Sequence, residues 1–230
     1  MTIEKVGNRL RVRFTAKELT LLIMAKFFKN VTSKIVNDAP TETELSENIK
    51  ILANKTVDTT DYEFFTAILE LYQQFERNCD FGFYLKNKFD LKTDKIETLD
   101  DVSKFRDDPP DVIVIYKGND YEFELKRYRD NIDFNSLSSF LKNKIVNHYS
   151  DKSNYLILLQ PKPNSNISLD TFNKLSKELI NYKSDFGRIT FTLNHDNNEI
   201  LTAFIFPNLE IYKRKYSNEH NLFADILHEE

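Results

Sequence analysis

The sequence DPPDVIVIYKGNDYEFELKRYR, residues 108–129, decides the fold that we expect for this chain. Residues 111–116 are β-branched or aromatic after the first position, and the two prolines before them favour the start of a strand. The next four residues form a turn in which Gly118 and Asn119 tolerate positive φ. The return run, residues 121–126, alternates strictly between apolar and charged side chains. This stretch therefore predicts a β-hairpin.

The charged positions of this hairpin suggest a chemical site. Alternation puts Glu124 and Lys126 on one face of the second strand, and antiparallel pairing brings Asp111 beside them. Two carboxylates at one place suit a hard divalent cation such as Mg²⁺. An ammonium group beside them can act on an attacking water or offset charge on a phosphate. An exposed, salt-bridged face of an ordinary hairpin is the alternative interpretation.

Pro110-Asp111 followed by Glu124-Leu125-Lys126 resembles the motif of the PD-(D/E)xK nucleases, the restriction-endonuclease-like superfamily. The resemblance implies that Asp111, Glu124 and the backbone carbonyl of Leu125 bind Mg²⁺ or Mn²⁺. It also implies that Lys126 is the catalytic lysine.

Several elements are expected before the hairpin. Residues 9–14 alternate like a short strand with a basic outer face. Capping-box patterns predict the beginnings of three helices, over residues 15–28, 40–53 and 60–77. Residues 81–91 are expected to form a strand, and a short helical turn is expected near residues 99–105.

The third of these helices carries Glu63 and Glu70 beside a broad apolar face. In the superfamily that the motif resembles, a glutamate from the helix before the sheet often joins the metal site. We prefer Glu70 for this role, because the capping box already accounts for Glu63.

The sequence after the hairpin predicts a helix at residues 135–149 and a buried, parallel strand at 155–159, which together complete a βαβ unit. A helix at residues 169–182 and a hairpin at residues 189–206 follow. The order helix, three strands, helix, strand over residues 61–160 corresponds to the core that the resemblance implies. We expect an α/β (α+β mixed sheet) fold with a restriction-endonuclease-like αβββαβ core, added N-terminal helices and a C-terminal β-hairpin. The expected domains are an N-terminal helical addition packed on the core, residues 1–60, and a nuclease-like domain, residues 61–230.

Composition narrows the function classes. The chain has 230 residues, of which 40% are hydrophobic and 30% are charged, and it has no apolar run of the length, about 18 residues, that a membrane span needs. The charged N-terminus and the single cysteine, Cys79, predict an intracellular (cytoplasmic) protein without disulfides. Four scattered histidines and one cysteine do not make a zinc site, and four glycines do not make a phosphate-cradling loop.

A net charge of −4 does not by itself indicate a nucleic-acid-binding protein, but binding depends on the local potential. The basic residues nearest the expected site are Arg127, Arg129, Lys142 and Lys144, which we treat as candidate nucleic-acid contacts.

The resulting hypothesis is a Mg²⁺- or Mn²⁺-dependent DNA endonuclease of restriction, defence or repair type. A homodimer would explain duplex cutting, because one such site cuts one strand. The first alternative is a catalytically inactive, nuclease-like module for nucleic-acid binding or assembly. The second is an RNA endonuclease of viral type, although the subset that places a histidine on a helix before the sheet is disfavoured, since no histidine precedes His148.

Overall fold

The computed structural model describes residues 1–27, 59–146, 154–160, 168–181, 187–195, 199–206 and 209–215. These residues form two compact units, divided after Asp120 inside strand β5 (Asn119–Tyr128): unit 1 contains Met1–Asp120, and unit 2 contains Tyr121–Ser217. None of the described helices is both long and apolar enough to span a membrane.

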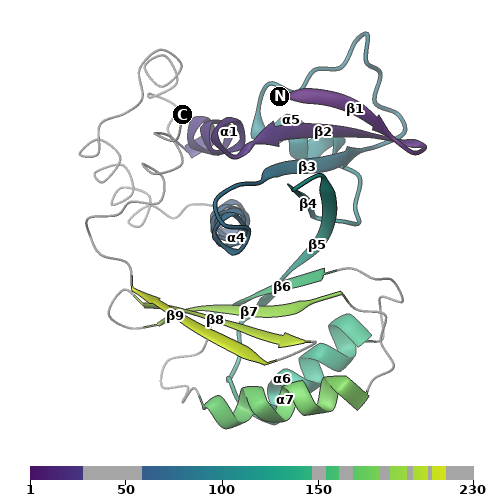
Figure 1. Ribbon diagram of the computed structural model, residues 1–230. Helices are drawn as coiled ribbons and strands as arrows, with labels where there is room; N and C mark the ends of the chain where they lie inside the picture. The colour runs from purple at the N-terminus through teal and green to yellow at the C-terminus, as the bar shows by residue number, and fades with distance from the viewer. Residues whose placement is uncertain are drawn as a thin grey trace. The chain divides into compact units, whose positions relative to one another are not determined.

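Unit 1 contains an antiparallel sheet in which the strands are neighbours in chain order (Figure 1). Its strands are β1 (Thr2–Val6), β2 (Arg9–Thr15), β3 (Asp80–Leu85) and β4 (Val112–Tyr116). Its described helices are α1 (Ala16–Phe27), α4 (Thr59–Gln74) and α5 (Leu99–Phe105).

One face of this sheet forms an aromatic core with α4. The rings of Phe64 on α4 and Phe83 on β3 are 6.0 Å apart, and those of Phe75 and Tyr116 are 5.4 Å apart. Phe14 on β2 packs edge-on against Phe83 at 6.1 Å. These contacts attach α4 and the residue that follows it, Phe75, to β3 and to β4, the strand that begins directly after Asp111.

A buried arginine occupies the other face. Arg11 is 6% exposed and forms ion pairs with Glu4, at 2.7 Å, and with Asp120. Burial disfavours its charge, but the hydrogen bonds and charges of Glu4 and Asp120 outweigh burial and raise the pKa of Arg11. Gly82 makes room for this side chain, because a Cβ atom on Gly82 would lie 3.0 Å from Cδ of Arg11.

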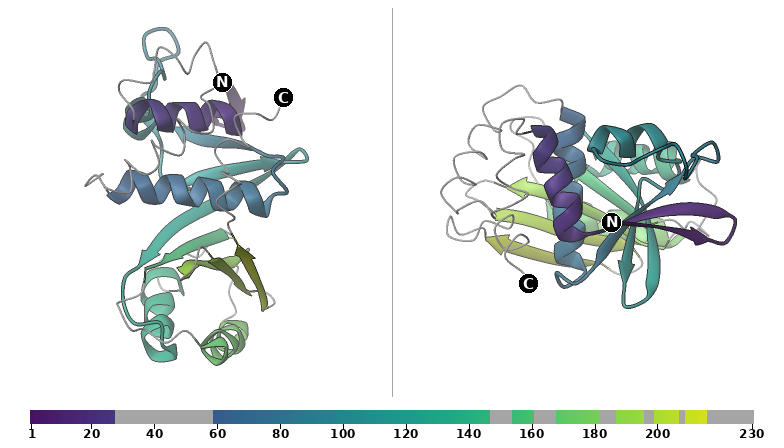
Figure 2. Two further views of the ribbon diagram at one scale, coloured as in Figure 1. Left: turned by 90° about the vertical axis from the view of Figure 1, so that its left-hand side faces the viewer. Right: turned by 90° about the horizontal axis from the view of Figure 1, so that it is seen from above.

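Unit 2 continues from β5 as a mixed sheet. Strands β5, β6 and β7 are parallel, whereas β7, β8 and β9 are antiparallel. Helices α6 and α7 lie on one face of this sheet (Figures 1 and 2). The remaining elements of unit 2 are β6 (Asn154–Leu159), β7 (Ile189–His195), β8 (Glu199–Phe206), β9 (Glu210–Lys215), α6 (Phe134–Leu141), the π-helical turn η1 (Lys142–Val146) and α7 (Leu169–Asn181).

The core of unit 2 lies between these two helices and the sheet. Tyr155, Ile157 and Phe191 from the strands are fully buried there, and Phe172 of α7 packs against Phe191 with ring centroids 6.0 Å apart. The predicted βαβ unit is confirmed, since α6 connects β5 to the parallel strand β6.

The predicted hairpin is present, but its turn is one residue earlier than expected. Strands β4 and β5 are hydrogen-bonded neighbours, and positive φ occurs at Lys117 (50°) and Gly118 (78°). Asn119, expected to adopt positive φ, already belongs to β5. A two-residue hairpin turn of this kind requires positive φ at both central residues, which places Lys117 in a conformation that glycine or asparagine adopts more readily.

The first helix and its cap are confirmed. The hydroxyl of Thr15 accepts from the Glu18 amide at 3.1 Å, and the Glu18 carboxylate accepts from the Thr15 amide at 2.9 Å. The short helix expected near residues 99–105 is also present, as are the helix and hairpin expected after β6. The helix expected at residues 40–53 lies outside the described residues.

Strands β1 and β9 were not predicted, and the strand expected over residues 81–91 is shorter, ending at Leu85. The described fold is therefore mixed α/β, with nine strands in the order β1 to β9 and five α-helices.

Candidate functional site

The lead-in to β4 positions two aspartates. Asp108 and Asp111 flank two prolines, and Asp111 immediately precedes Val112, the first residue of β4. Arg106, at the end of α5, donates from its guanidinium to the backbone carbonyl of Asp111 at 3.0 Å. A second guanidinium nitrogen lies 3.4 Å from Oδ1 of the same residue. Arg106 thus holds both the main chain and the carboxylate of Asp111.

The second strand of the hairpin supplies a buried ion pair. Glu124 and Lys126 are two residues apart on β5 and therefore share a face. Lys126 Nζ lies 2.8 Å from Glu124 Oε2. The residue Glu124 is 1% exposed, although alternating charge on a hairpin usually faces solvent. A carboxylate so deeply buried needs charged or hydrogen-bonding partners to remain ionised.

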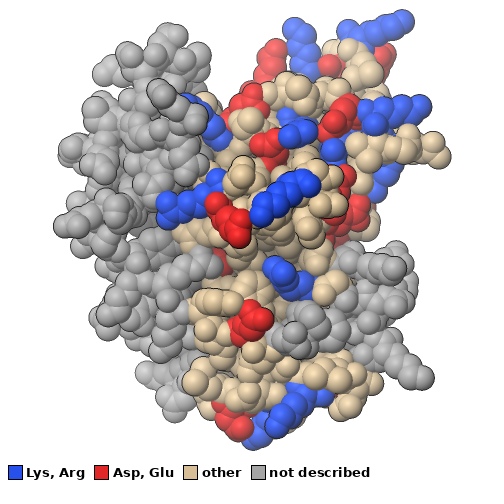
Figure 3. Space-filling view, viewed as in Figure 1, with Lys and Arg blue, Asp and Glu red and all other residues tan. Residues whose placement is uncertain are grey.

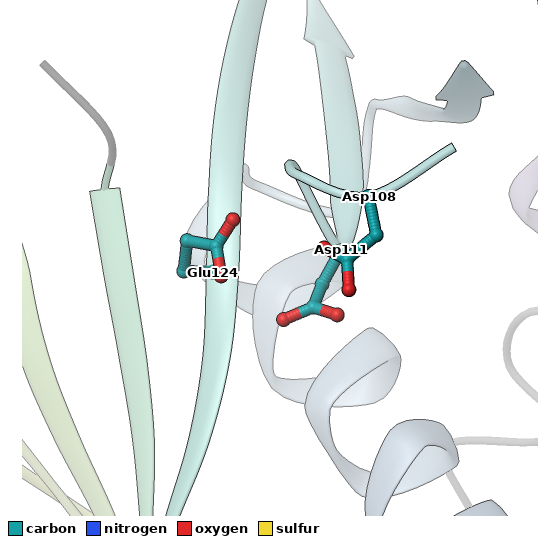
Figure 4. A group of neighbouring side chains, drawn as sticks. All are labelled: Asp108, Asp111 and Glu124. Carbon is teal, nitrogen blue, oxygen red and sulfur yellow. The ribbon is translucent and has the colours of Figure 1, made fainter. Parts of the chain in front are cut away.

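Three carboxylates gather at the open end of this hairpin. One ligand oxygen each of Asp108, Asp111 and Glu124 lies within 4.8 Å of the other two (Figure 4). Asp108 is exposed, Asp111 is half-buried and Glu124 is buried. Like charges at such distances repel one another, and positive charge at the same place reduces the repulsion.

The donor set fits a hard divalent cation. Oxygens around an octahedral Mg²⁺ at about 2.1 Å lie about 3.0 Å apart when adjacent and about 4.2 Å apart when opposite. The three carboxylate oxygens lie within 4.8 Å of one another, close enough for them to share one cation.

The structure brings together some of the residues singled out from the sequence. Asp111 and Glu124 are in one group, Lys126 contacts Glu124, and Leu125 lies between them on β5. Asp108 was missed. Its signal was weak, because it is one of two consecutive aspartates before Pro109, and only the aspartate after Pro110 matches the motif.

Glu70 is not a member of this carboxylate group. It is 3% exposed on α4, and its Oε1 accepts a hydrogen bond of 3.1 Å from Gln74, one turn later. The side chain of Glu63 lies outside the described residues.

The candidate nucleic-acid contacts have contrasting surroundings within unit 2. Arg129 donates to Oε1 of Gln160 at 2.9 Å, and Lys142 forms an ion pair of 2.7 Å with Glu178 on α7. Arg127 is half-buried on β5, whereas Lys144 is exposed on η1. In the view of Figure 3, positive and negative side chains are interspersed over the visible part of unit 1.

Comparison of the chain with protein-family models, with curated proteins and with solved structures found no match.

Proposed function

We propose that this protein is a metal-dependent nuclease that hydrolyses phosphodiester bonds, with DNA as the preferred substrate and Mg²⁺ or Mn²⁺ as the cofactor. The observation that carries the proposal is the group formed by Asp108, Asp111 and Glu124, with Lys126 beside it. Oxygen ligands and an adjacent ammonium group are what metal-assisted phosphate hydrolysis needs.

The roles of the chain's own groups follow from their positions. Asp111 and Glu124 would hold the cation, with Asp108 and the Leu125 carbonyl as further ligands. Lys126 would orient the attacking water and offset negative charge that develops on the phosphate. Arg106 would act as a positioning residue, since it fixes the backbone and carboxylate of Asp111. A bound divalent cation would lower the pKa of water and neutralise charge on the phosphoryl oxygens.

The order of elements supports a restriction-endonuclease-like core. Helix α4, strands β3, β4 and β5, helix α6 and strand β6 follow one another as helix, three strands, helix, strand. Helix α5 is inserted between β3 and β4, and further strands precede and follow this series. In this proposal β1 and β2 at one end, and α7 with β7–β9 at the other, are additions to the core, and a homodimer would cut duplex DNA.

A second candidate function is a nuclease-like module that binds or assembles without cutting. The ion pairs Arg106–Asp111 and Lys126–Glu124 favour it, because they supply positive charge to two of the three carboxylates without a metal. Metal binding and cleavage distinguish the two candidates.

The test compares cleavage of plasmid, single-stranded DNA and single-stranded RNA in Mg²⁺ or Mn²⁺ by the unaltered protein and four variants. Asp111→Asn, Glu124→Gln and Lys126→Ala should each reduce the cleavage rate at least a hundredfold, while circular dichroism shows that the fold is retained. Glu122→Gln, on the same strand but outside the carboxylate group, is the matched control and should cut normally. Metal-dependent stabilisation without cleavage of any substrate would favour the binding module. Absence of both would overturn the nuclease and favour the binding module, whose ion pairs need no metal.

A further inference from the structure

Unit 1 contains a second polar feature, separate from the three carboxylates. It is a cavity of about 370 Å³, lined by the end of β2 with the start of α1, by the segment after α4, and by the turn between β4 and β5. Neither Asp108 nor Asp111 lines it. Because all lining residues belong to unit 1, its shape is a property of that unit alone.

The charge around this cavity is strongly positive. Four cationic side chains, Arg13, Lys17, Arg77 and Lys117, line it with a single carboxylate, Asp80. Asp80 accepts from Nε of Arg13 at 2.7 Å, so these two charges compensate each other locally. Three positive charges therefore exceed the negative charge of the lining.

Lys117 has a nearby acidic residue, but the pair is open to solvent. Its Nζ lies 3.4 Å from Oε2 of Glu76, and both side chains are more than half exposed. An exposed ion pair of this kind contributes little to stability, and an anion of higher charge can compete with it. Lys117 is therefore able to serve a ligand in the cavity.

The beginning of α1 adds hydrogen-bond donors. The cap of this helix uses the amides of Thr15 and Glu18, whereas Ala16 and Lys17 are first-turn residues whose amides have no partner within the helix. Thr15, Ala16 and Lys17 all line the cavity. The first turn of a helix favours negative charge, and phosphates bind there through backbone amides.

We propose that this cavity binds a phosphate group, carried by a nucleotide or by a nucleic-acid strand. The cationic side chains that exceed the negative charge of the lining, Lys17, Arg77 and Lys117, would recognise the phosphate together with the first turn of α1. The volume, about 370 Å³, is at the lower end of the range for small-ligand sites and suits a mononucleotide. The proposal does not depend on nuclease activity, and it requires no metal.

The experiment is isothermal titration calorimetry in phosphate-free buffer with EDTA. The probes are inorganic phosphate, adenosine 5′-monophosphate, adenosine, and an eight-residue DNA oligonucleotide with or without a 5′-phosphate. The cavity variant combines Lys17→Gln with Lys117→Asn, since asparagine tolerates positive φ and removes the charge without disturbing the turn. The matched control combines Lys92→Gln with Lys95→Gln, two exposed lysines of unit 1 that do not line the cavity.

We expect a phosphate-bearing probe to bind at least tenfold more tightly than its phosphate-free counterpart. The cavity variant should lose at least tenfold in affinity, while the control retains it. If inorganic phosphate binds as tightly as the nucleotide, the ligand is free phosphate. If the phosphorylated oligonucleotide binds more tightly than the nucleotide, the ligand is a nucleic-acid strand. No binding of any probe at millimolar concentration, or equal binding by both double variants, would overturn the proposal. A negative result would leave the nuclease proposal standing, because EDTA removes divalent cations and the titration therefore does not test metal-dependent cleavage.

Discussion

The Nζ atom of Lys126 lies 2.8 Å from Oε2 of Glu124, whose side chain is only 2% exposed. Removing one partner of a buried ion pair leaves a charge in a poorly solvated place. Because Lys126 is itself partly exposed, we expect Lys126→Met to lower the free energy of unfolding by about 1 to 3 kcal/mol, less than for a fully buried pair. Urea denaturation measures this loss.

The control for this pair is the same substitution made in a Glu124→Gln background. There the carboxylate charge is already absent, so Lys126→Met should cost much less. An equal cost in both backgrounds would mean that Lys126 stabilises the fold through packing of its aliphatic stem and not through Glu124.

Asp108 tests the metal proposal without disturbing the fold. Because it is exposed, Asp108→Asn should change the free energy of unfolding by less than about 0.5 kcal/mol. The same substitution should weaken Mn²⁺ binding about tenfold, since it removes one charged oxygen ligand. Glu97→Gln, an exposed carboxylate outside the group, makes the same change in net charge and should bind Mn²⁺ normally. Indistinguishable titrations for the two variants would remove Asp108 from the site.

Gly82 is required by the neighbouring Arg11. Its Cβ would lie 3.0 Å from Cδ and 3.3 Å from Cγ of Arg11, whose head group is fixed by Glu4 and Asp120. We expect Gly82→Ala to lower the free energy of unfolding by about 1 to 3 kcal/mol through overpacking. In an Arg11→Ala background the clash is gone, so thermal denaturation should show little further loss when Gly82 is replaced.

Asp133 gives unit 2 an acid-sensitive helix cap. Its carboxylate accepts from the backbone amide of Ser136 at 2.9 Å and from the Ser136 hydroxyl at 2.8 Å, and these bonds lower its pKa from the ordinary 3.8. A carboxylate whose pKa is lower in the folded protein stabilises the folded state fully at pH values above its pKa in the unfolded chain. This contribution is lost as the pH falls through its pKa in the folded protein. Below about pH 4 the unaltered protein should therefore lose stability more steeply than Asp133→Asn, because asparagine caps without titrating. Urea denaturation of both proteins between pH 2.5 and 6 measures this difference. The prediction is contradicted if the difference between their free energies of unfolding stays constant over that range.

Cys79, the single cysteine, reports on the folding of unit 1. Burial, and then the nearby charge of Asp80, raise the pKa of its thiol from 9.0 to about 12. At pH 8 the thiolate fraction is therefore about a thousandfold smaller than in the unfolded chain, and alkylation requires the thiolate. Reaction with iodoacetamide should be slow in the folded protein and should accelerate at the urea midpoint. Fast alkylation without urea would show that Cys79 is more accessible than its 7% exposure indicates.

The strongest local signals predicted the fold best. The β-branched run before Lys117, the capping box at Thr15 and the apolar run of β6 each specify an element without help from distant residues, and all three are present. The unpredicted strands β1 and β9 are each only five or six residues long and rich in charge. Neither shows the apolar alternation that marks a half-buried strand, and their positions depend on pairing with β2 and β8.

The candidate site was predictable only where the motif and the strand period agreed. Asp111, Glu124 and Lys126 follow from the spacing of one hairpin. Asp108 and Arg106 depend on the path of the chain between α5 and β4, which no periodicity specifies. The burial of Glu124 also depends on tertiary packing, because an alternating strand alone predicts that its charges face solvent.

Strand β1 is an edge strand, since β2 is its one neighbour in the described sheet. Exposed edges invite strand-to-strand aggregation, which proteins avoid with short strands that carry charges. β1 has five residues, including Glu4 and Lys5, and Glu4 is already engaged by Arg11. A second copy of the chain that extended the sheet here would pair over only a short strand and would place its own side chains beside these charges, so this edge disfavours uncontrolled polymerisation.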